Sequence, residues 1–180
     1  ALTPGTTTLS YTKTTDGCDN SMLYTVYAKP IAPVIENVIQ PTCYLPTGSI
    51  ELSGLPDIGF WTILRYPNAI PYQGSGTNMV INGLPIESSY TFTVINGDYC
   101  TSNVSANAII NGMPVNPVLS GPPSICTGAT TNFLPNSGGT WTSSNPLVAT
   151  INNSGQVTAL APGTATFTFV RLSDGCRNSI

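Results

Sequence analysis

The 180-residue chain has no histidine and few charges, with five Lys and Arg against eight Asp and Glu. Without histidine, the Ser–His–Asp and Cys–His arrangements of nucleophilic catalysis are excluded. The net charge of −3 provides no basic surface, which argues against a nucleic-acid partner. No apolar run approaches the roughly 20 residues of a membrane-spanning helix, so we expect no membrane insertion. We therefore expect a protein that is not an enzyme and uses no cofactor.

Helical periodicity is also absent, since no stretch keeps apolar residues at helical spacing over about ten residues. Residue types that favour strands (Thr, Val, Ile, Tyr and Phe) are separated by Gly, Pro and Asn, which favour turns. The clearest strand-like runs in the middle of the chain are Ser49–Leu52, Phe60–Arg65, Thr77–Ile81, Tyr90–Ile95 and Val104–Ile110. Many short strands separated by turns predict an all-β protein built from tandem β-sandwiches.

The last 22 residues repeat the first 22 without a gap, 158 positions apart. Eleven of the 22 positions are identical, and Asp16-Gly17-Cys18 matches Asp174-Gly175-Cys176. A near-copy at a fixed spacing is typical of a repeat array. We therefore expect the chain to be a window of just over one repeat unit.

A second internal similarity marks where modules begin. The pattern Pro-Ile/Val-x-Pro-Val-Ile/Leu occurs at residues 30–35 and again at 114–119, and a cysteine follows each copy. Proline stiffens both joints because it fixes its own φ and keeps the preceding residue extended. We divide the chain into residues 1–29 (the end of a preceding module), 30–113 (one β-sandwich) and 114–180 (a second module without its last strand).

The five cysteines are scattered and have no histidine beside them, which argues against a metal site. The repeat places Cys18 and Cys176 in equivalent positions. We expect the disulfides Cys43–Cys100 and Cys126–Cys176, with the partner of Cys18 lying ahead of residue 1. Persistent disulfides imply an oxidising, extracellular setting.

Two stretches resemble known modules. The patterns Trp-x-Ser at Trp141, Val-Ala-x-Ile at Val148, Gly-x-Val at Gly155 and Gly-x-Ala-x-Phe at Gly163 resemble the bacterial immunoglobulin-like group 2 domain. The run from Gly83 to Val94 resembles the E–F corner of fibronectin type III domains. That resemblance implies that the hydroxyl of Tyr90 bonds the backbone of the preceding loop and that Trp61 is the buried core aromatic. Trp141, in the group 2-like stretch, is also expected to be structural.

Alternating modules of these two kinds, rich in Thr and Asn, resemble the repeats of giant surface adhesins of Bacteroidota, of the gliding-motility type exported by type IX secretion. The resemblance implies a stiff stalk at the bacterial cell surface that serves adhesion and gliding. Its partners would be neighbouring repeats of the same chain, and a surface polysaccharide or solid substratum. Two alternatives stay open: an accessory or carbohydrate-binding region of a secreted polysaccharide enzyme, and a filament subunit completed by strand exchange.

One stretch, Tyr66–Gln73, is a candidate contact region, because loops between strands commonly carry binding residues. Tyr66 and Tyr72 could stack on a sugar, and Asn68 and Gln73 could form hydrogen bonds with it. In the competing interpretation, which we favour, the two prolines of the stretch shape the loop and the tyrosine rings cover the edge of the sandwich.

Overall fold

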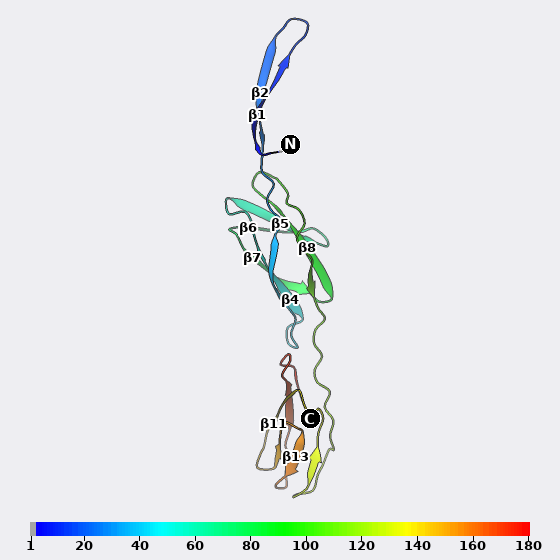
Figure 1. Ribbon diagram of the computed structural model, residues 1–180. Helices are drawn as coiled ribbons and strands as arrows, with labels where there is room; N and C mark the ends of the chain where they lie inside the picture. Colours follow the sequence, from blue (N-terminus) through cyan, green and yellow to red (C-terminus); the bar gives the residue numbers. More distant parts are fainter. Residues whose placement is uncertain (1–2) are drawn as a thin grey trace. The chain divides into compact units, whose positions relative to one another are not determined.

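The computed structural model describes residues 3–180, and all of its regular elements are strands (Figure 1). The first two residues of the expected 1–29 segment lie outside this range. The described residues divide into two compact units. Unit 1 comprises the described chain as far as Ile39 together with Ser49–Leu84 and Ser88–Ile110, and unit 2 comprises Gln40–Gly48, Pro85–Glu87 and Asn111–Ile180. Across the same residues, no helix has the length and apolar character to cross a bilayer.

Unit 1 begins with an antiparallel hairpin of β1 (Gly5–Thr12) and β2 (Asp19–Val26). Every residue of β1 and all but Val26 of β2 are exposed. Alternating Thr and apolar residues are well suited to a strand, which explains the pairing. Nothing in the exposure pattern distinguishes a core face from a solvent face in this hairpin.

The rest of unit 1 is a sandwich of two antiparallel sheets. One sheet has the order β3 (Val34–Ile39), β4 (Thr47–Ser53), β7 (Met79–Pro85), and the other has the order β6 (Ile70–Ser75), β5 (Phe60–Tyr66), β8 (Ser88–Ile95), β9 (Ala108–Ile110). Both contribute to the core: Ile50, Leu52, Ile81 and Leu84 from the first sheet, and Trp61, Ile63, Phe92 and Val94 from the second. The alternation in Phe60–Arg65 and Tyr90–Ile95 thus directs every second side chain inward.

The stretch expected to be a loop between strands is mostly a strand. Residues 70–75 form β6, which pairs with β5 so that Pro71 lies opposite Leu64, and only the turn before Ile70 connects them. Proline disfavours a central strand because it lacks an N–H, but β6 is at the edge of its sheet, where that donor is not needed. The prolines of this stretch therefore indicated a loop, although an edge strand tolerates them.

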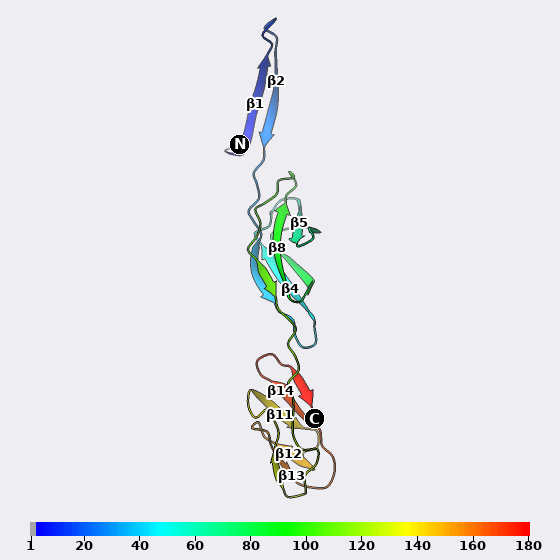
Figure 2. The same ribbon diagram turned by 90° about the vertical axis from the view of Figure 1, so that its right-hand side faces the viewer.

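Unit 2 is a second sandwich, with one sheet of β10 (Thr130–Asn132), β13 (Gln156–Ala159) and β12 (Ala149–Ile151) (Figure 2). The other sheet contains β11 (Gly139–Ser143), β14 (Phe167–Arg171) and β15 (Arg177–Ser179). The core between them consists of Phe133, Trp141, Ala149, Val157, Phe167 and Phe169. The indole N–H of Trp141 donates to the carbonyl oxygen of Pro135 at 2.9 Å, so this buried ring leaves no unsatisfied donor.

Candidate functional site

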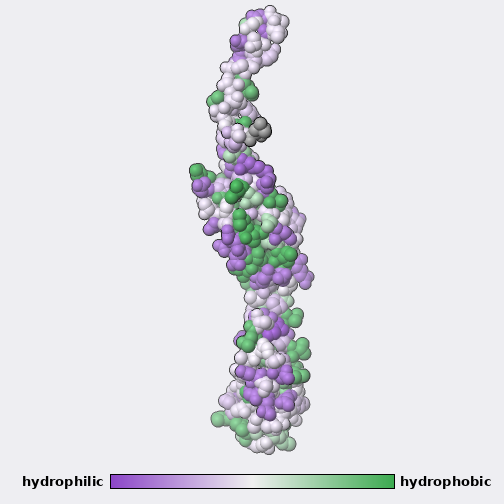
Figure 3. All heavy atoms as spheres, in the orientation of Figure 1, coloured by the Kyte–Doolittle hydropathy of each residue, from purple (hydrophilic) through white to green (hydrophobic). Residues whose placement is uncertain are grey.

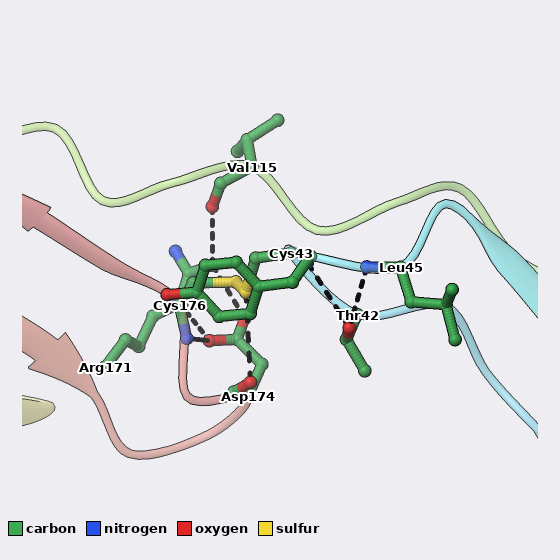
Figure 4. The surroundings of a disulfide bond; sticks show 8 residues. Thr42, Cys43, Leu45, Val115, Arg171, Asp174 and Cys176 are labelled. Carbon is green, nitrogen blue, oxygen red and sulfur yellow. Dashed lines mark hydrogen bonds and ion pairs between the residues drawn. A yellow bond between two sulfur atoms is a disulfide. The ribbon is translucent and has the colours of Figure 1, made fainter.

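A disulfide joins Cys43, in the segment Gln40–Gly48 that follows β3, to Cys176, in the turn between β14 and β15 (Figure 4). Their Cα atoms are 5.5 Å apart, although 133 residues separate them in the sequence. The expected pairs Cys43–Cys100 and Cys126–Cys176 are therefore wrong, and Cys100 and Cys126 are free. The prediction paired each cysteine within its own stretch of sequence, whereas Gln40–Gly48 folds as part of unit 2.

Asp174 organises the turn that carries Cys176. Its two carboxylate oxygens each accept a bond from Nε of Arg171 at 2.9 Å, and Oδ2 accepts a further bond from Nη2 at 2.6 Å. Oδ1 also accepts from the backbone N–H of Cys176 at 3.0 Å. The hydrogen bonds from Arg171 lower the pKa of Asp174, and the same bonds raise the pKa of Arg171. This charge-assisted fork fixes the turn and, through its backbone, the sulfur of Cys176.

The same sheet holds the extended segment of unit 2 that precedes β10. Nη2 of Arg171 donates to the carbonyl oxygen of Val115 at 2.7 Å, and the side-chain amide of Asn178 donates to that of Pro117 at 3.1 Å. Residues 115–117 pair with no strand, so these side chains satisfy carbonyls that a β-ladder would otherwise serve. Arg171 thus links the disulfide turn to the proline-rich segment.

The segment around Cys43 is also ordered by local bonds. The hydroxyl oxygen of Thr42 accepts from the backbone N–H of Tyr44 at 3.3 Å and of Leu45 at 3.1 Å, while the N–H of Thr42 donates to the carbonyl oxygen of Leu45. The guanidinium of Arg177 lies 5.6 Å from the centre of the Tyr44 ring, within the range of a cation–π contact. Each sulfur of the disulfide therefore lies in a turn with its own hydrogen bonds.

Among the described residues, Cys43, Asp174 and Cys176 are the group whose potential ligand atoms lie close enough for a metal ion, all within 4.8 Å. The two sulfurs are bonded to each other, so neither is available as a thiolate. The carboxylate of Asp174 is already held by Arg171. A structural zinc site needs about four ligands, which this set cannot supply. The cluster has a covalent function and is no metal centre.

The β1–β2 hairpin reproduces the β14–β15 turn at the 158-residue spacing. Tyr11 pairs with Asn20 in the first hairpin as Phe169 pairs with Asn178 in the second. In both turns the glycine N–H donates to the carbonyl oxygen of the residue four positions earlier, at a distance of 2.9 Å. The glycine φ values are 72° and 71°. The sequence repeat is therefore a structural repeat. Cys18 occupies the position of Cys176 and is free and exposed.

The four candidate contact residues do not share a face. Tyr72 lies opposite the buried Ile63 and so points to the inner face of the sheet, whereas Gln73 lies opposite Thr62 on the outer face. Asn68 is in the connecting turn, with a φ of 76°, and Tyr66 ends β5. The structure does not assemble a stacking surface from these side chains, which favours the competing interpretation.

Arg65 was not among the residues predicted to be functional. Alternation places it on the inner face, where its guanidinium lies 5.2 Å from the ring centre of Tyr90 and 5.9 Å from that of Tyr72. Its Nε atom is buried and has no hydrogen-bond partner among the described residues. The alternation in Phe60–Arg65 could have located it. Trp61 and Tyr90 are both buried, and the hydroxyl bond expected of Tyr90 remains a prediction.

A family profile agrees with the architecture of unit 2. The family profile of the bacterial Ig-like domain, group 2, matches residues 129–173. The second unit contains an Ig-like module. Among solved structures, the chain is similar to the C-terminal 282-residue fragment of intimin in complex with the intimin-binding domain of the translocated intimin receptor, with a TM-score of 0.49 and 12% identity. That alignment covers 85% of this chain and 64% of the intimin chain. No curated protein sequence matches the chain.

Proposed function

We propose that the chain is a load-bearing segment of an extracellular adhesin at a bacterial cell surface, where its role is mechanical and not catalytic. The Cys43–Cys176 disulfide carries the proposal. A force applied to the two ends of the chain follows the covalent path to Cys43, crosses the disulfide and leaves at Cys176. The residues between the two cysteines lie inside a closed covalent loop and bear none of this load as extended chain.

The loop limits how far the chain can lengthen. At about 3.4 Å per extended residue, a separation of 133 residues corresponds to about 45 nm of chain that the disulfide withholds. Without the bond, the same residues would release this length on unfolding. Within this segment, only the residues ahead of Cys43 and those after Cys176 therefore lengthen under load.

The extracellular setting rests on the same bond, because structural disulfides form and persist in oxidising compartments. The more specific assignment, to the gliding-motility adhesins of Bacteroidota and their type IX export, rests on the sequence resemblance described above. In that setting the partners are neighbouring repeats, and a polysaccharide or solid substratum bound elsewhere on the adhesin.

Single-molecule force spectroscopy on the oxidised chain, held by its two ends, tests the proposal. We expect complete extension to remain about 45 nm shorter than in the same chain after reduction. Cys43→Ser should behave like the reduced chain even under oxidising conditions. Cys18→Ser is the matched control and should extend like the unchanged protein, because Cys18 is free. Equal extension of the oxidised and reduced chains would refute the load-bearing role of this bond.

A further inference from the structure

The pattern Asn-x-Ser, which marks acceptors of N-linked glycans, occurs at residues 103–105 and at residues 152–154. At such a site a sugar is attached to the side-chain amide nitrogen of the asparagine. Asn103 and Asn152 are both exposed, so accessibility of the asparagine does not separate the two sites. They differ in the hydrogen bonds of the asparagine and of the serine that follows it.

The second site lies in a turn with a fixed conformation. Asn152 begins the turn of residues 152–155 that joins β12 to β13. Its backbone N–H donates to the carbonyl oxygen of Gln156 at 3.0 Å, and its carbonyl accepts from the N–H of Gly155 at 2.9 Å. The side-chain oxygen of Asn153 accepts from the backbone N–H of Trp141 at 3.1 Å, which attaches the turn to β11. The turn therefore presents Asn152 to solvent from a rigid base.

The side chain of Asn152 is arranged for chemistry at its nitrogen. Its Oδ1 atom accepts from the hydroxyl of Ser154 at 2.7 Å, from the N–H of Ser154 at 3.1 Å and from the N–H of Gln156 at 3.0 Å. Its Nδ2 atom donates to none of the described residues. Donors aimed at an oxygen stabilise the negative charge that develops on it, as in an oxyanion hole. These three donors therefore favour loss of a proton from Nδ2, which makes the nitrogen nucleophilic.

The first site lacks this arrangement. Oδ1 of Asn103 accepts from the ammonium group of Lys29 at 2.7 Å. The hydroxyl of Ser105 accepts from the buried N–H of Phe92 at 2.9 Å and donates to the carbonyl oxygen of Ala106 at 2.7 Å. Turning this hydroxyl toward Asn103 would leave the N–H of Phe92 without a partner, which is costly in the interior. The serine of this site therefore belongs to the sandwich and does not act on its asparagine.

We propose that Asn152 is an N-glycosylation site of the folded protein, that Asn103 is not, and that the donor is a glycan linked to a lipid pyrophosphate. The Nδ2 atom forms a bond to the anomeric carbon of the glycan, and the bond from that carbon to the pyrophosphate oxygen breaks. The proton lost by Nδ2 passes to a base of the transferring enzyme. Such transfer takes place outside the cytoplasm, so the inference rests on the extracellular setting of the proposed function.

Peptide mass spectrometry of the protein isolated from the cells that produce it tests the inference directly. We expect a glycan on Asn152, located by fragmentation that retains the sugar, and an unmodified Asn103. An unmodified Asn152, hydrolysis of its amide without a glycan, or equal occupancy of the two sites would overturn the inference. The same map, made without reduction, reports the Cys43–Cys176 bond, so failure of the extracellular setting is seen separately.

An assay with purified components separates the effect of the fold from that of the motif. The enzyme is an oligosaccharyltransferase that modifies synthetic peptides of residues 100–107 and 149–156 at similar rates. It is given the intact, oxidised chain and a lipid pyrophosphate-linked oligosaccharide. We expect Asn152 to be modified about tenfold or more faster than Asn103, because the hydroxyl of Ser105 is held by the sandwich. Equal rates in the folded chain would overturn the inference.

Substitutions within the turn complete the test. Asn152→Asp keeps an oxygen for all three donors but has no amide nitrogen, so the variant should fold and take no glycan at this position. Ser154→Ala removes the hydroxyl donor and should slow the transfer, whereas Ser154→Thr should retain it. Asn103→Asp is the matched control and should leave the modification of Asn152 unchanged. Full modification of Asn152 in the Ser154→Ala variant would contradict the assigned role of the hydroxyl.

Discussion

The two hairpins of this chain, β1–β2 and β14–β15, have nearly the same sequence and the same register but opposite environments. Tyr11 is 70% exposed, whereas its counterpart Phe169 is 1% exposed, and Leu9 is 51% exposed against 7% for Phe167. The space-filling view shows apolar side chains among polar ones at the surface (Figure 3). Hairpin pairing and turn geometry are thus properties of the local sequence, while burial depends on what the rest of a module supplies.

The equivalent cysteines of the two hairpins also differ in whether they form a disulfide. Cys176 is buried and bonded to Cys43, whereas Cys18 is exposed and free in a turn of the same shape. The turn presents a cysteine in either case, and the partner comes from a distant segment. A bond at this position therefore depends on a segment distant in the sequence and not on the hairpin itself.

The largest expected effect comes from removing the disulfide. Closing a loop of 133 residues stabilises the folded state by about 5 kcal/mol in the chain-entropy relation, so Cys176→Ser should lower the free energy of unfolding of unit 2 by an amount of this order. Cys18→Ser removes the equivalent thiol and should leave the free energy unchanged. Urea unfolding followed by Trp141 fluorescence, in a Trp61→Phe background, measures both. Equal effects of the two substitutions would contradict the assignment.

The second effect concerns the aromatic residue at the equivalent position of each hairpin, Tyr11 or Phe169. Phe169 contacts Trp141 with ring centres 5.1 Å apart, and Phe169→Ala should destabilise unit 2 by about 4 kcal/mol through the cavity that it creates. Tyr11→Ala, at the equivalent exposed position, should change stability by less than about 0.5 kcal/mol. The same fluorescence assay reads both values. A large effect of Tyr11→Ala would show that the first hairpin is covered in solution.

The amino-acid sequence was sufficient for the parts of the fold that depend on local pattern. The alternation in Phe60–Arg65 correctly predicted β5, and the Trp141 and Gly155 motifs correctly indicated an Ig-like module. The Cys43–Cys176 pairing could not be predicted in this way. It depends on the segment Gln40–Gly48 folding with unit 2, which neither periodicity nor residue spacing records.

The third effect should be equal in the two hairpins. Gly17 and Gly175 have left-handed φ values of 72° and 71°, and an added Cβ would meet no atom within 4 Å at either position. Substitution by Ala therefore costs only backbone strain, about 1 kcal/mol at each site. For Gly175→Ala, urea unfolding of unit 2 should show this loss. For Gly17→Ala, backbone chemical shifts should show a reduced hairpin population, and unit 2 should be unaffected.

The smallest effect concerns the cation that holds each turn, which is Lys13 in the first hairpin and Arg171 in the second. The side-chain hydrogen bond from Lys13 lowers the pKa of Asp16, as the bonds from Arg171 lower the pKa of Asp174. A depressed pKa in the folded state contributes stability that is present above the usual Asp value of about 3.9 and is lost as the pH falls through the folded value.

Carbon-13 NMR titration of the two carboxyl groups measures this effect. Arg171→Lys would give the second turn the same type of cation as the first turn, which has Lys13. Lysine supplies a point charge where arginine supplies a planar fork, so we expect the pKa of Asp174 to rise when that fork is lost. The bond to the Val115 carbonyl would be lost at the same time, because one ammonium group replaces a guanidinium that reaches both partners. An unchanged pKa of Asp174 would show that charge alone, without the fork, holds this turn.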